Sequence, residues 1–395
     1  MKQKKIRILR IVGRLNIGGP AIQAITLTTR LNNAFFESKL IVGSVSEGEG
    51  DMSFLAKEFG VEPIFVPEIS REINFIKDII ATWKAFNTIR DFKPHILHTH
   101  TAKAGFVGRV GAIFARVPIR VHTFHGHVLS EYFGCFRSFL FVCIEIMLAC
   151  FTDRIIAISA KQKSDLTSRF KITSKEKCTV VPLGINIGKY LKLDNGNNVL
   201  AKKELGYREE ELIIAIIGRL TKIKNHKLFL DMAKSLLGKS REKLRFAIIG
   251  DGKLKEELVK YVNRLDIADR VRFFGWRRDM ERIYSAVDII GLTSFNEGTP
   301  VVIIEAMASA KPVVSTSVGG VSDLVKEGYN GYLVNRFDVN LFSDKMNILI
   351  EDKDKRLSMG LNGREFVKGR YDESTLVNNI IKLYKELLDK KGIKI

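Results

Sequence analysis

The stretch from Phe295 to Val314, FNEGTPVVIIEAMASAKPVV, carries two carboxylates in an otherwise apolar run. We expect a loop followed by a helix that begins near Thr299 and Pro300, because proline suits a first helical turn. Glu305 follows Glu297 by about two turns of such a helix, so both carboxylates can face the same side. Backbone N–H groups at the helix start can bind phosphate, and carboxylates can accept hydrogen bonds from sugar hydroxyls. The pattern indicates a nucleotide-sugar site; helix capping by Glu297 beside a solvated Glu305 is the alternative.

Two cations follow another apolar strand. Arg219 and Lys224 lie in GRLTKIK, directly after the run LIIAII. Fixed cations after a strand can stabilise negative charge that develops on a leaving group. The alternative is two solvated surface cations.

Near the start of the chain, Gly18 and Gly19 follow the first expected strand. Residues without side chains allow the backbone to approach a phosphate or an acceptor closely. The complete dinucleotide fingerprint, three glycines followed by an acidic residue, is absent. Its absence argues against an NAD enzyme.

Six of the seven histidines fall in one short part of the chain: His95, His98, His100, His122, His125 and His127. They stand in two expected strands, HILHTH and IRVHTFH, or just after them, and so indicate a ligand-binding sheet edge. HTH and HGH also place alternate residues on one face of a strand, which makes a zinc-dependent hydrolase an alternative. The Asp-x-Asp string at 352–354 lies in a charged helical turn, so we predict no metal there.

Short β-branched runs alternate with amphipathic stretches, which predicts an α/β fold with parallel sheets covered by helices. The polar stretch Asn186 to Asn198, NIGKYLKLDNGNN, interrupts the series and is expected to be a linker. We predict a Rossmann-like acceptor domain at 1–186, a Rossmann-like donor domain at 187–370, and a terminal helix at 371–395 that packs back on the first domain. Two doubly wound domains facing across a cleft would bind ligands at the carboxyl ends of their strands.

The formal net charge of +20 and the pI near 9.7 favour an anionic partner. No zinc-finger spacing or aromatic-studded basic run accompanies the charge, which argues against nucleic acid. The longest apolar stretch, Phe139 to Phe151, is too short to cross a bilayer and is expected to be a buried helix. The start of the chain fits a first strand better than a signal peptide. The cysteines are expected to be reduced core thiols of a cytosolic protein: Cys135, Cys143, Cys150 and Cys178.

These motifs together resemble a known family. EGTPVVIIEAMA has the spacing of two glutamates found in retaining glycosyltransferases of the GT-B fold, and closely resembles family 4 of that class, also called glycosyltransferase group 1. Further similar motifs follow in the same order as in the family: NIGGPAIQ, VHTFHGH, GRLTKIKNH, IIGDG, FFGWRRD and KPVVSTSVGG. The resemblance covers nearly the whole chain and points to enzymes of bacterial surface-polysaccharide synthesis.

The resemblance implies a role for each motif. Glu305 would bind the ribose hydroxyls, Glu297 the donor sugar, and Arg219 and Lys224 the donor diphosphate. His125 would approach the donor sugar. The expectation that His98 and His100 flank the acceptor rests on their proximity to His125 and not on the resemblance. The remaining donor-binding positions would be Gly18, Gly19, Gly250, Asp251, Gly252, Trp276, Gly298, Thr299, Pro300 and Val301.

The expected activity is transfer of a sugar, with retention, from a UDP-sugar to a saccharide acceptor. No covalent nucleophile stands out, so we expect same-face attack in which the departing phosphate helps to remove the acceptor proton. The resemblance implies no metal and no cofactor. The basic first domain and the apolar patch at 132–142 favour a lipid-linked acceptor and a peripheral place on the inner face of the cell membrane. A nucleotide-sugar 2-epimerase of the same fold is the alternative.

Overall fold

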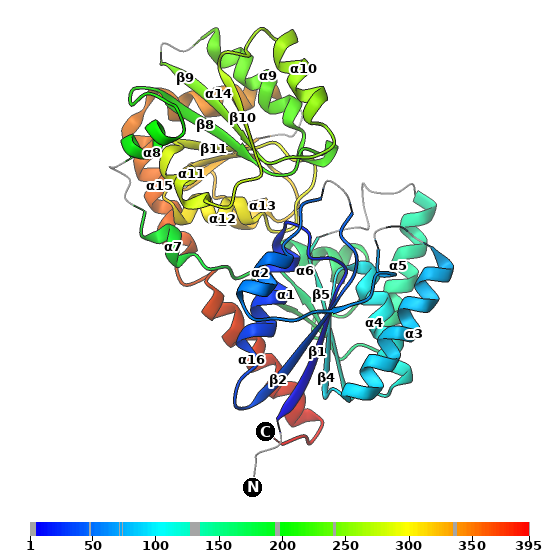
Figure 1. Cartoon of the computed structure of the whole chain (residues 1–395). Helices are drawn as coiled ribbons and strands as arrows, with labels where there is room; N and C mark the ends of the chain where they lie inside the picture. Colours follow the sequence, from blue (N-terminus) through cyan, green and yellow to red (C-terminus); the bar gives the residue numbers. More distant parts are fainter. Residues whose placement is uncertain are drawn as a thin grey trace. The chain divides into compact units, whose positions relative to one another are not determined.

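The computed structural model describes residues 5–46, 49–70, 72, 74–126, 135–193, 198–239, 242–334 and 338–394. It divides into two compact units. Unit 1 comprises Met1–Ile185 and Glu373–Ile395, and unit 2 comprises Asn186–Asp372. Each unit is a parallel sheet with helices on both faces, which confirms the α/β, doubly wound fold class (Figure 1).

The sheet of unit 1 has seven strands in the order β3-β2-β1-β4-β5-β6-β7. Its strands are β1 (Ile6–Val12), β2 (Phe36–Val42), β3 (Ile64–Phe65), β4 (Ile96–His100), β5 (Ile119–Phe124), β6 (Arg154–Ala157) and β7 (Cys178–Val180). Its helices are α1 (Gly19–Arg30), α2 (Ser53–Glu58), α3 (Phe75–Phe92), α4 (Ala102–Phe114), α5 (Cys135–Cys150), α6 (Ala160–Ser164), the π-helical turn Asp165–Arg169 and α16 (Glu373–Lys390). Figure 1 shows α3, α4 and α5 together on one side of this sheet and α1 with α16 on the other.

The last helix, α16, is part of the core of unit 1. Leu376, Ile380 and Leu383 are buried in one cluster with Ile6 and Ile8 of β1. The chain re-enters unit 1 where the Glu373 N–H donates to the Ile185 carbonyl oxygen at 3.0 Å. Burial of this apolar face, rather than helix propensity alone, stabilises α16.

The sheet of unit 2 has six strands in the order β10-β9-β8-β11-β12-β13. They are β8 (Leu212–Ile217), β9 (Leu244–Ile249), β10 (Val271–Gly275), β11 (Ile289–Leu292), β12 (Val313–Thr316) and β13 (Gly331–Val334). The helices are α7 (Gly188–Leu191), α8 (Asn198–Glu204), the 3-10 turn Lys222–Lys224, α9 (His226–Leu237), α10 (Lys255–Arg264), α11 (Met280–Ala286), α12 (Val301–Ala308), α13 (Val321–Leu324), α14 (Val339–Glu351) and α15 (Lys353–Val367). Strand β8 is buried along its whole length, as expected for a parallel sheet covered on both faces.

Three expectations from the sequence are wrong in detail. The stretch from Asn186 is not simply a linker, because α7 packs into unit 2 and Tyr190 is 2% exposed. Helix α5 is not a fully buried helix, since several of its apolar side chains face solvent. Cys143 and Cys150 are exposed for the same reason, whereas Cys178 is buried as a core thiol. The expectation for the Cys135 side chain falls outside what the structure describes. Local composition did not reveal which helix face meets the sheet.

None of the described helices is both long and apolar enough to span a membrane.

Candidate functional site

Two glycine-containing loops meet at the carboxyl ends of β8 and β9. A side chain on Gly250, whose φ is +133°, would place its Cβ 2.0 Å from the Gly218 carbonyl oxygen. A Cβ on Gly252 would lie 2.7 Å from the Leu220 carbonyl oxygen. The Leu220 N–H donates to the Asp251 carbonyl oxygen at 2.9 Å and joins the two loops. Glycine at 250 and 252 is therefore required for this close approach.

The Asp251 side chain accepts hydrogen bonds next to the start of α10. It accepts from the Gly252 N–H and from Lys255 Nζ, each at 2.8 Å. Burial would raise the pKa of Asp251, but the hydrogen bonds from Lys255 and the Gly252 N–H outweigh it and lower that pKa below its ordinary value. The carboxylate is thus ionised and already paired within its own loop.

Lys224 and Glu297, predicted from separate motifs, are in direct contact. Lys224 Nζ donates to Glu297 Oε1 at 2.6 Å, and the two side chains are 19% and 11% exposed. Ser294 Oγ donates to the same oxygen at 2.5 Å. The Phe295 N–H donates to the Ile223 carbonyl oxygen at 2.8 Å, so the two loops are joined through their backbones as well. A cation and a carboxylate are thereby fixed side by side next to the start of α12.

The other predicted residues of this region occupy the same edge of the sheet. Arg219 is half-buried in the loop that follows β8. Helix α12 begins at Val301, with Pro300 at the preceding capping position and Gly298 and Thr299 in the loop before it. The helix starts one to two residues later than predicted. The Ile303 N–H donates to the Pro300 carbonyl oxygen at 3.1 Å, and the N–H groups before it, at the start of the helix, can donate to an anion.

Glu305 lies on α12 and is held between two tyrosines. The Tyr190 hydroxyl donates to Oε1 and the Tyr284 hydroxyl to Oε2, each at 3.0 Å. Burial raises the pKa of Glu305, and the two tyrosine hydrogen bonds lower it in part. Each carboxylate oxygen keeps a second lone pair, so the group can still accept from a ligand. We call this arrangement the tyrosine clamp; sequence analysis missed it because Tyr190 lay in the expected linker.

Trp276 follows β10 and is 38% exposed, so its indole is not an ordinary core side chain. A half-exposed indole offers a flat apolar surface on which a planar ligand can stack.

In unit 1 four buried histidines stand on the neighbouring strands β4 and β5 or directly after them; His100 and His125 are hydrogen-bonded to each other, whereas His98 and His122 bond to other side chains. We call His98, His100, His122 and His125 the histidine cluster. The Nδ1 of His100 and Nε2 of His125 are 2.9 Å apart, and the rings of His98 and His100 stack at 4.3 Å. Burial lowers the pKa of each well below its ordinary value, in the case of His125 to about 3. The cluster is therefore neutral at pH 7.

Several ring nitrogens of the cluster are used in hydrogen bonds, whereas His100 Nε2 and His122 Nε2 are buried without a hydrogen-bond partner among the described residues. His98 uses both ring nitrogens, with the Tyr384 hydroxyl and Thr123 Oγ1, each at 2.7 Å. His122 Nδ1 pairs with Thr99 Oγ1 at 2.8 Å. Within the described part of the chain, no group of three or more His, Cys, Asp or Glu could hold a metal ion. His127 lies outside the described residues, and His95 lies at the opposite end of β4, where its Nδ1 accepts from the Arg7 N–H.

The edge that carries the histidine cluster has further signs of a binding site. Gly18 precedes α1 and Gly19 is its first residue, at the carboxyl end of β1. Thr101, directly after His100, has a φ of +70°, which is strained for a β-branched residue. Such strain gathers at functional sites because surrounding contacts must hold it.

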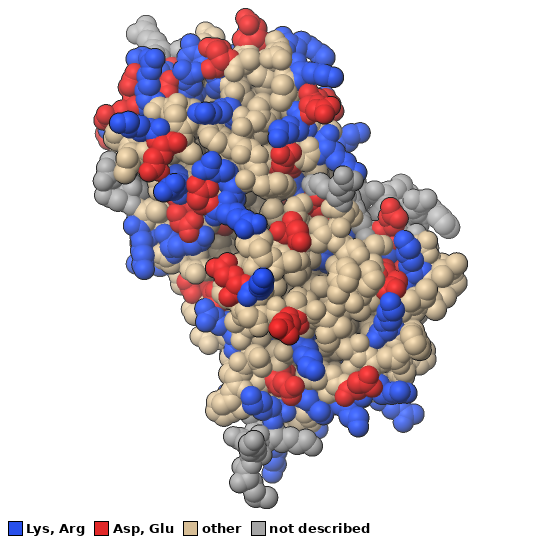
Figure 2. Space-filling view, in the orientation of Figure 1, with Lys and Arg blue, Asp and Glu red and all other residues tan. Residues whose placement is uncertain are grey.

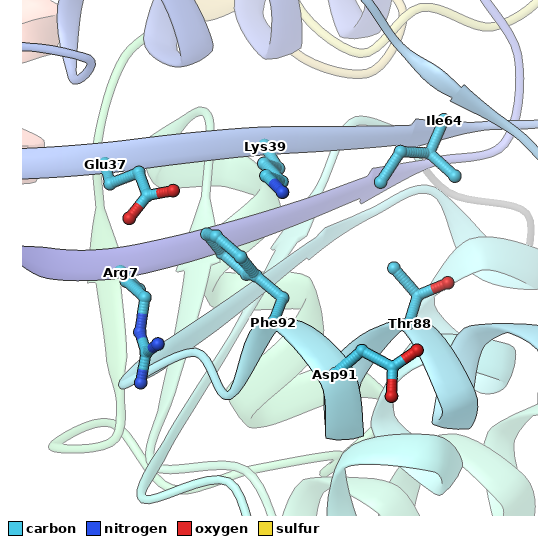
Figure 3. A pocket seen from close by; sticks show the side chains of 7 residues that line it. All are labelled: Arg7, Glu37, Lys39, Ile64, Thr88, Asp91 and Phe92. Atoms are coloured by element: carbon cyan, nitrogen blue, oxygen red, sulfur yellow. The ribbon is translucent and has the colours of Figure 1, made fainter.

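A small depression of about 310 Å³ on unit 1 lies elsewhere. Figure 3 shows its lining: Arg7, Glu37, Lys39, Ile64, Thr88, Asp91 and Phe92. Arg7 and Glu37 are the second residues of β1 and β2, so they lie at the amino ends of these strands. Ligands of open α/β sheets bind at the opposite edge, so this depression is not the candidate site.

The comparisons with known proteins match both units. The model described as Glycosyltransferase Family 4 matches residues 17–189, and the model described as Glycosyl transferases group 1 matches residues 200–366. The chain is 28% identical over 352 residues to the UDP-Gal:alpha-D-GlcNAc-diphosphoundecaprenol alpha-1,3-galactosyltransferase of Escherichia coli, covering 86% of this chain and 90% of that protein. It is 27% identical to the capsular polysaccharide biosynthesis glycosyltransferase CapM of Staphylococcus aureus, covering 84% and 87%.

Among solved structures, Anabaena Alr3699/HepE in complex with UDP has a TM-score of 0.81 at 22% identity, covering 96% of this chain and all of that one. Its complex with UDP-glucose has a TM-score of 0.80 at 23% identity. This likeness shows the GT-B fold. The two family models lie one on each unit and together span most of the sequence. This chain belongs to the glycosyltransferases of group 1 that carry a family 4 first domain.

Proposed function

We propose that this glycosyltransferase moves a sugar, with retention, from a UDP-sugar to a lipid-linked saccharide during synthesis of a surface polysaccharide. The observation that carries the proposal is the pairing of Lys224 with Glu297 at 2.6 Å beside the start of α12. One edge of unit 2 thus offers a cation and free N–H groups for a diphosphate, and a carboxylate for sugar hydroxyls. Glu305, farther along the same helix, would accept from the ribose.

In the proposed reaction the bond between the anomeric carbon and the β-phosphate oxygen breaks. The acceptor oxygen attacks the anomeric carbon from the same face, and the departing diphosphate takes the acceptor's proton. Arg219 and Lys224 stabilise the charge that grows on the leaving oxygen. His125 is neutral and acts as a hydrogen-bond partner of the donor sugar rather than as a cation. The reaction needs no metal and no cofactor.

The names of the relatives support a UDP-sugar as the proposed donor and a lipid-linked saccharide as the proposed acceptor. The E. coli relative is named for a UDP-galactose donor and a diphosphoundecaprenol-linked acceptor. The proposed acceptor here is a saccharide on a polyprenyl diphosphate, which would bring the enzyme to the inner face of the cell membrane. The net charge of +20 supports contact with an anionic lipid surface.

The test is product analysis with chelator-treated full-length protein. UDP- and GDP-sugars are offered with a membrane lipid extract, and free nucleotide diphosphate, new nucleotide sugars and the glycolipid are measured. We expect UDP release that depends on one sugar and on the lipid fraction, with an α-linked product from an α-linked donor. A new nucleotide sugar without UDP release would favour the epimerase, and activity only with restored zinc would favour the hydrolase.

Variants connect the activity to the site. Glu297→Ala and Lys224→Ala should each lower the rate by about a hundredfold, as losses of preorganised charged groups do. Lys222→Ala is the matched control, because Lys222 is an exposed lysine in the same turn. Full activity in Glu297→Ala, or an equal loss in the control, would contradict the assigned site.

A further inference from the structure

Helix α3 turns its largest apolar side chains toward solvent. The side chains that it buries against α4 and the sheet are smaller or lie near its end: Ala81, Ala85, Ile89 and Phe92. The large side chains of its first turns are exposed: Phe75, Ile76, Ile79, Ile80 and Trp83. Phe75 is 79% exposed and Trp83 62%. We call these five exposed residues the docking face.

The docking face follows helical periodicity. Ile76, Ile79, Ile80 and Trp83 recur at intervals of three and four residues, so they form one stripe along the helix. An ordinary amphipathic helix would turn such a stripe inward. Contiguous exposed apolar surface of this kind marks an interaction site in a soluble protein.

A second helix extends the apolar surface. On and just after α5 the exposed apolar side chains are Phe139, Leu140, Ile146, Met147 and Phe151. Figure 1 shows α3, α4 and α5 side by side. The ion pairs Lys103–Asp78, between α4 and α3, and Arg109–Glu145, between α4 and α5, both at 2.7 Å, agree with this arrangement. Of the apolar patch predicted at 132–142, residues 132–134 lie outside the described residues.

The docking face begins at the edge of the sheet that carries the histidine cluster. Helices that connect parallel strands run opposite to them, so the first turns of α3 and α5 lie at the carboxyl ends of the strands. Phe75 and Ile76 stand in the first turn of α3 at that edge, and Phe139 and Leu140 lie near the start of α5. Phe114, also 73% exposed, ends α4 at the opposite edge.

The charges beside the docking face suit an anionic surface. Lys77 is exposed in the first turn of α3, and Asp78 next to it is neutralised by its ion pair with Lys103. Residues 1–190 contain 27 Lys and Arg against 15 Asp and Glu, an excess of 12 positive charges. Figure 2 shows a largely tan surface, broken by charged residues, in the region where Figure 1 labels α3. Apolar side chains that include a tryptophan and lie beside an exposed lysine suit a helix that lies in a membrane interface.

We propose that the docking face inserts into the interface of an anionic bilayer. The apolar side chains of α3 enter the headgroup boundary, and Lys77 contacts acidic headgroups. Docking at this edge would bring the acceptor region of unit 1 close to the membrane surface, where the diphosphate of a lipid-linked acceptor lies. The choice of a bilayer as the partner rests on the proposed lipid-linked acceptor.

The chain supplies its own reporter for the test, because it contains two tryptophans. In a Trp276→Phe variant the fluorescence comes from Trp83 alone. We expect its emission to shift to the blue when vesicles of phosphatidylcholine with phosphatidylglycerol are added, and lipids brominated near the headgroup to quench it. No shift and no quenching would overturn the proposal.

Partitioning of the full-length protein to the same vesicles gives a second measurement. Ile76→Ser and Ile79→Ser should each lower the partition coefficient about tenfold or more, since each removes a large apolar side chain from the interface. Phe114→Ser, an equally exposed position at the other edge, should leave it within about twofold. An equal loss in Phe114→Ser would overturn the proposal. Loss of a dimer in Ile79→Ser, seen by sedimentation without any vesicles, would show instead that a second copy covers the face.

Transfer to a short-chain, water-soluble acceptor separates this proposal from the proposed function. Ile76→Ser and Ile79→Ser should keep that activity, because both side chains face solvent and neither belongs to the proposed site. Vesicle binding without any transferase activity would contradict the function alone. Transfer to the soluble acceptor without vesicle binding would contradict the docking face alone.

Discussion

Replacing one tyrosine of the clamp by phenylalanine tests how Glu305 is held. Tyr284→Phe removes one hydroxyl, which donates to Glu305 at 3.0 Å, and keeps the ring in place. Tyr284 is fully buried, so no water replaces the lost donor without rearrangement. Hydrogen bonds to a charged group contribute about 1.5–3 kcal/mol. We expect the free energy of unfolding to fall by roughly that amount at pH 8, where the carboxyl is most fully ionised.

The loss should depend on pH. Because burial raises the native pKa of Glu305 above that of the unfolded chain, the native state holds this proton more tightly, and stability falls as pH rises through the native pKa. The Tyr284 hydroxyl lowers that pKa, so its removal raises the pKa further and extends the fall to higher pH. The difference between variant and native protein should therefore be smaller at pH 5 than at pH 8.

The assay is urea unfolding of the full chain at pH 5 to 8, together with UDP titration by calorimetry. If Glu305 binds the ribose, we expect the Kd for UDP to rise about tenfold, which corresponds to 1.4 kcal/mol. Tyr261→Phe is the matched control, since the Tyr261 hydroxyl donates to Asp231 at 2.6 Å elsewhere in unit 2. A loss in Tyr284→Phe that is equal at both pH values, or UDP affinity no weaker than in the control, would refute the reasoning.

Three further predictions follow from named contacts. Gly250→Ala should destabilise the protein by about 2 kcal/mol or more in thermal unfolding, because the new Cβ would meet the Gly218 carbonyl oxygen at 2.0 Å; unchanged melting would contradict the close approach. Cys143 should react with a thiol reagent in the native protein while Cys178 stays unreactive, because burial raises the Cys178 pKa to about 11; mass spectrometry of the labelled peptides decides this. The histidine cluster, whose native pKa values lie below those of the unfolded chain, should make stability fall as pH drops below about 6.5; a flat denaturant midpoint from pH 7 to pH 5 would contradict its buried, neutral state.

Local signals in the sequence were sufficient for the fold class and for the order of the motifs. β-Branched runs bury both faces of a parallel strand, so β8 could be recognised from LIIAII alone. Proline at 300 marks the start of a helix, and this signal depends on backbone geometry within the segment itself, which is why it can be read without a structure. The need for glycine at 250 and 252 was not readable in this way, because the oxygens that exclude a Cβ there belong to Gly218 and Leu220 in a different loop.

Contacts between distant residues were decided only by the tertiary structure. Lys224 and Glu297 are 73 residues apart and Tyr190 and Glu305 are 115 apart, and no spacing rule connects them. The orientation of α3 was equally hidden, because a stripe of apolar residues has the same period whether it faces the sheet or the solvent. Small residues such as Ala81 and Ala85 could lie against α4, and this packing left the larger side chains outside. Sequence determined which elements form and which chemical groups they carry; packing determined which of those groups meet and which face remains open.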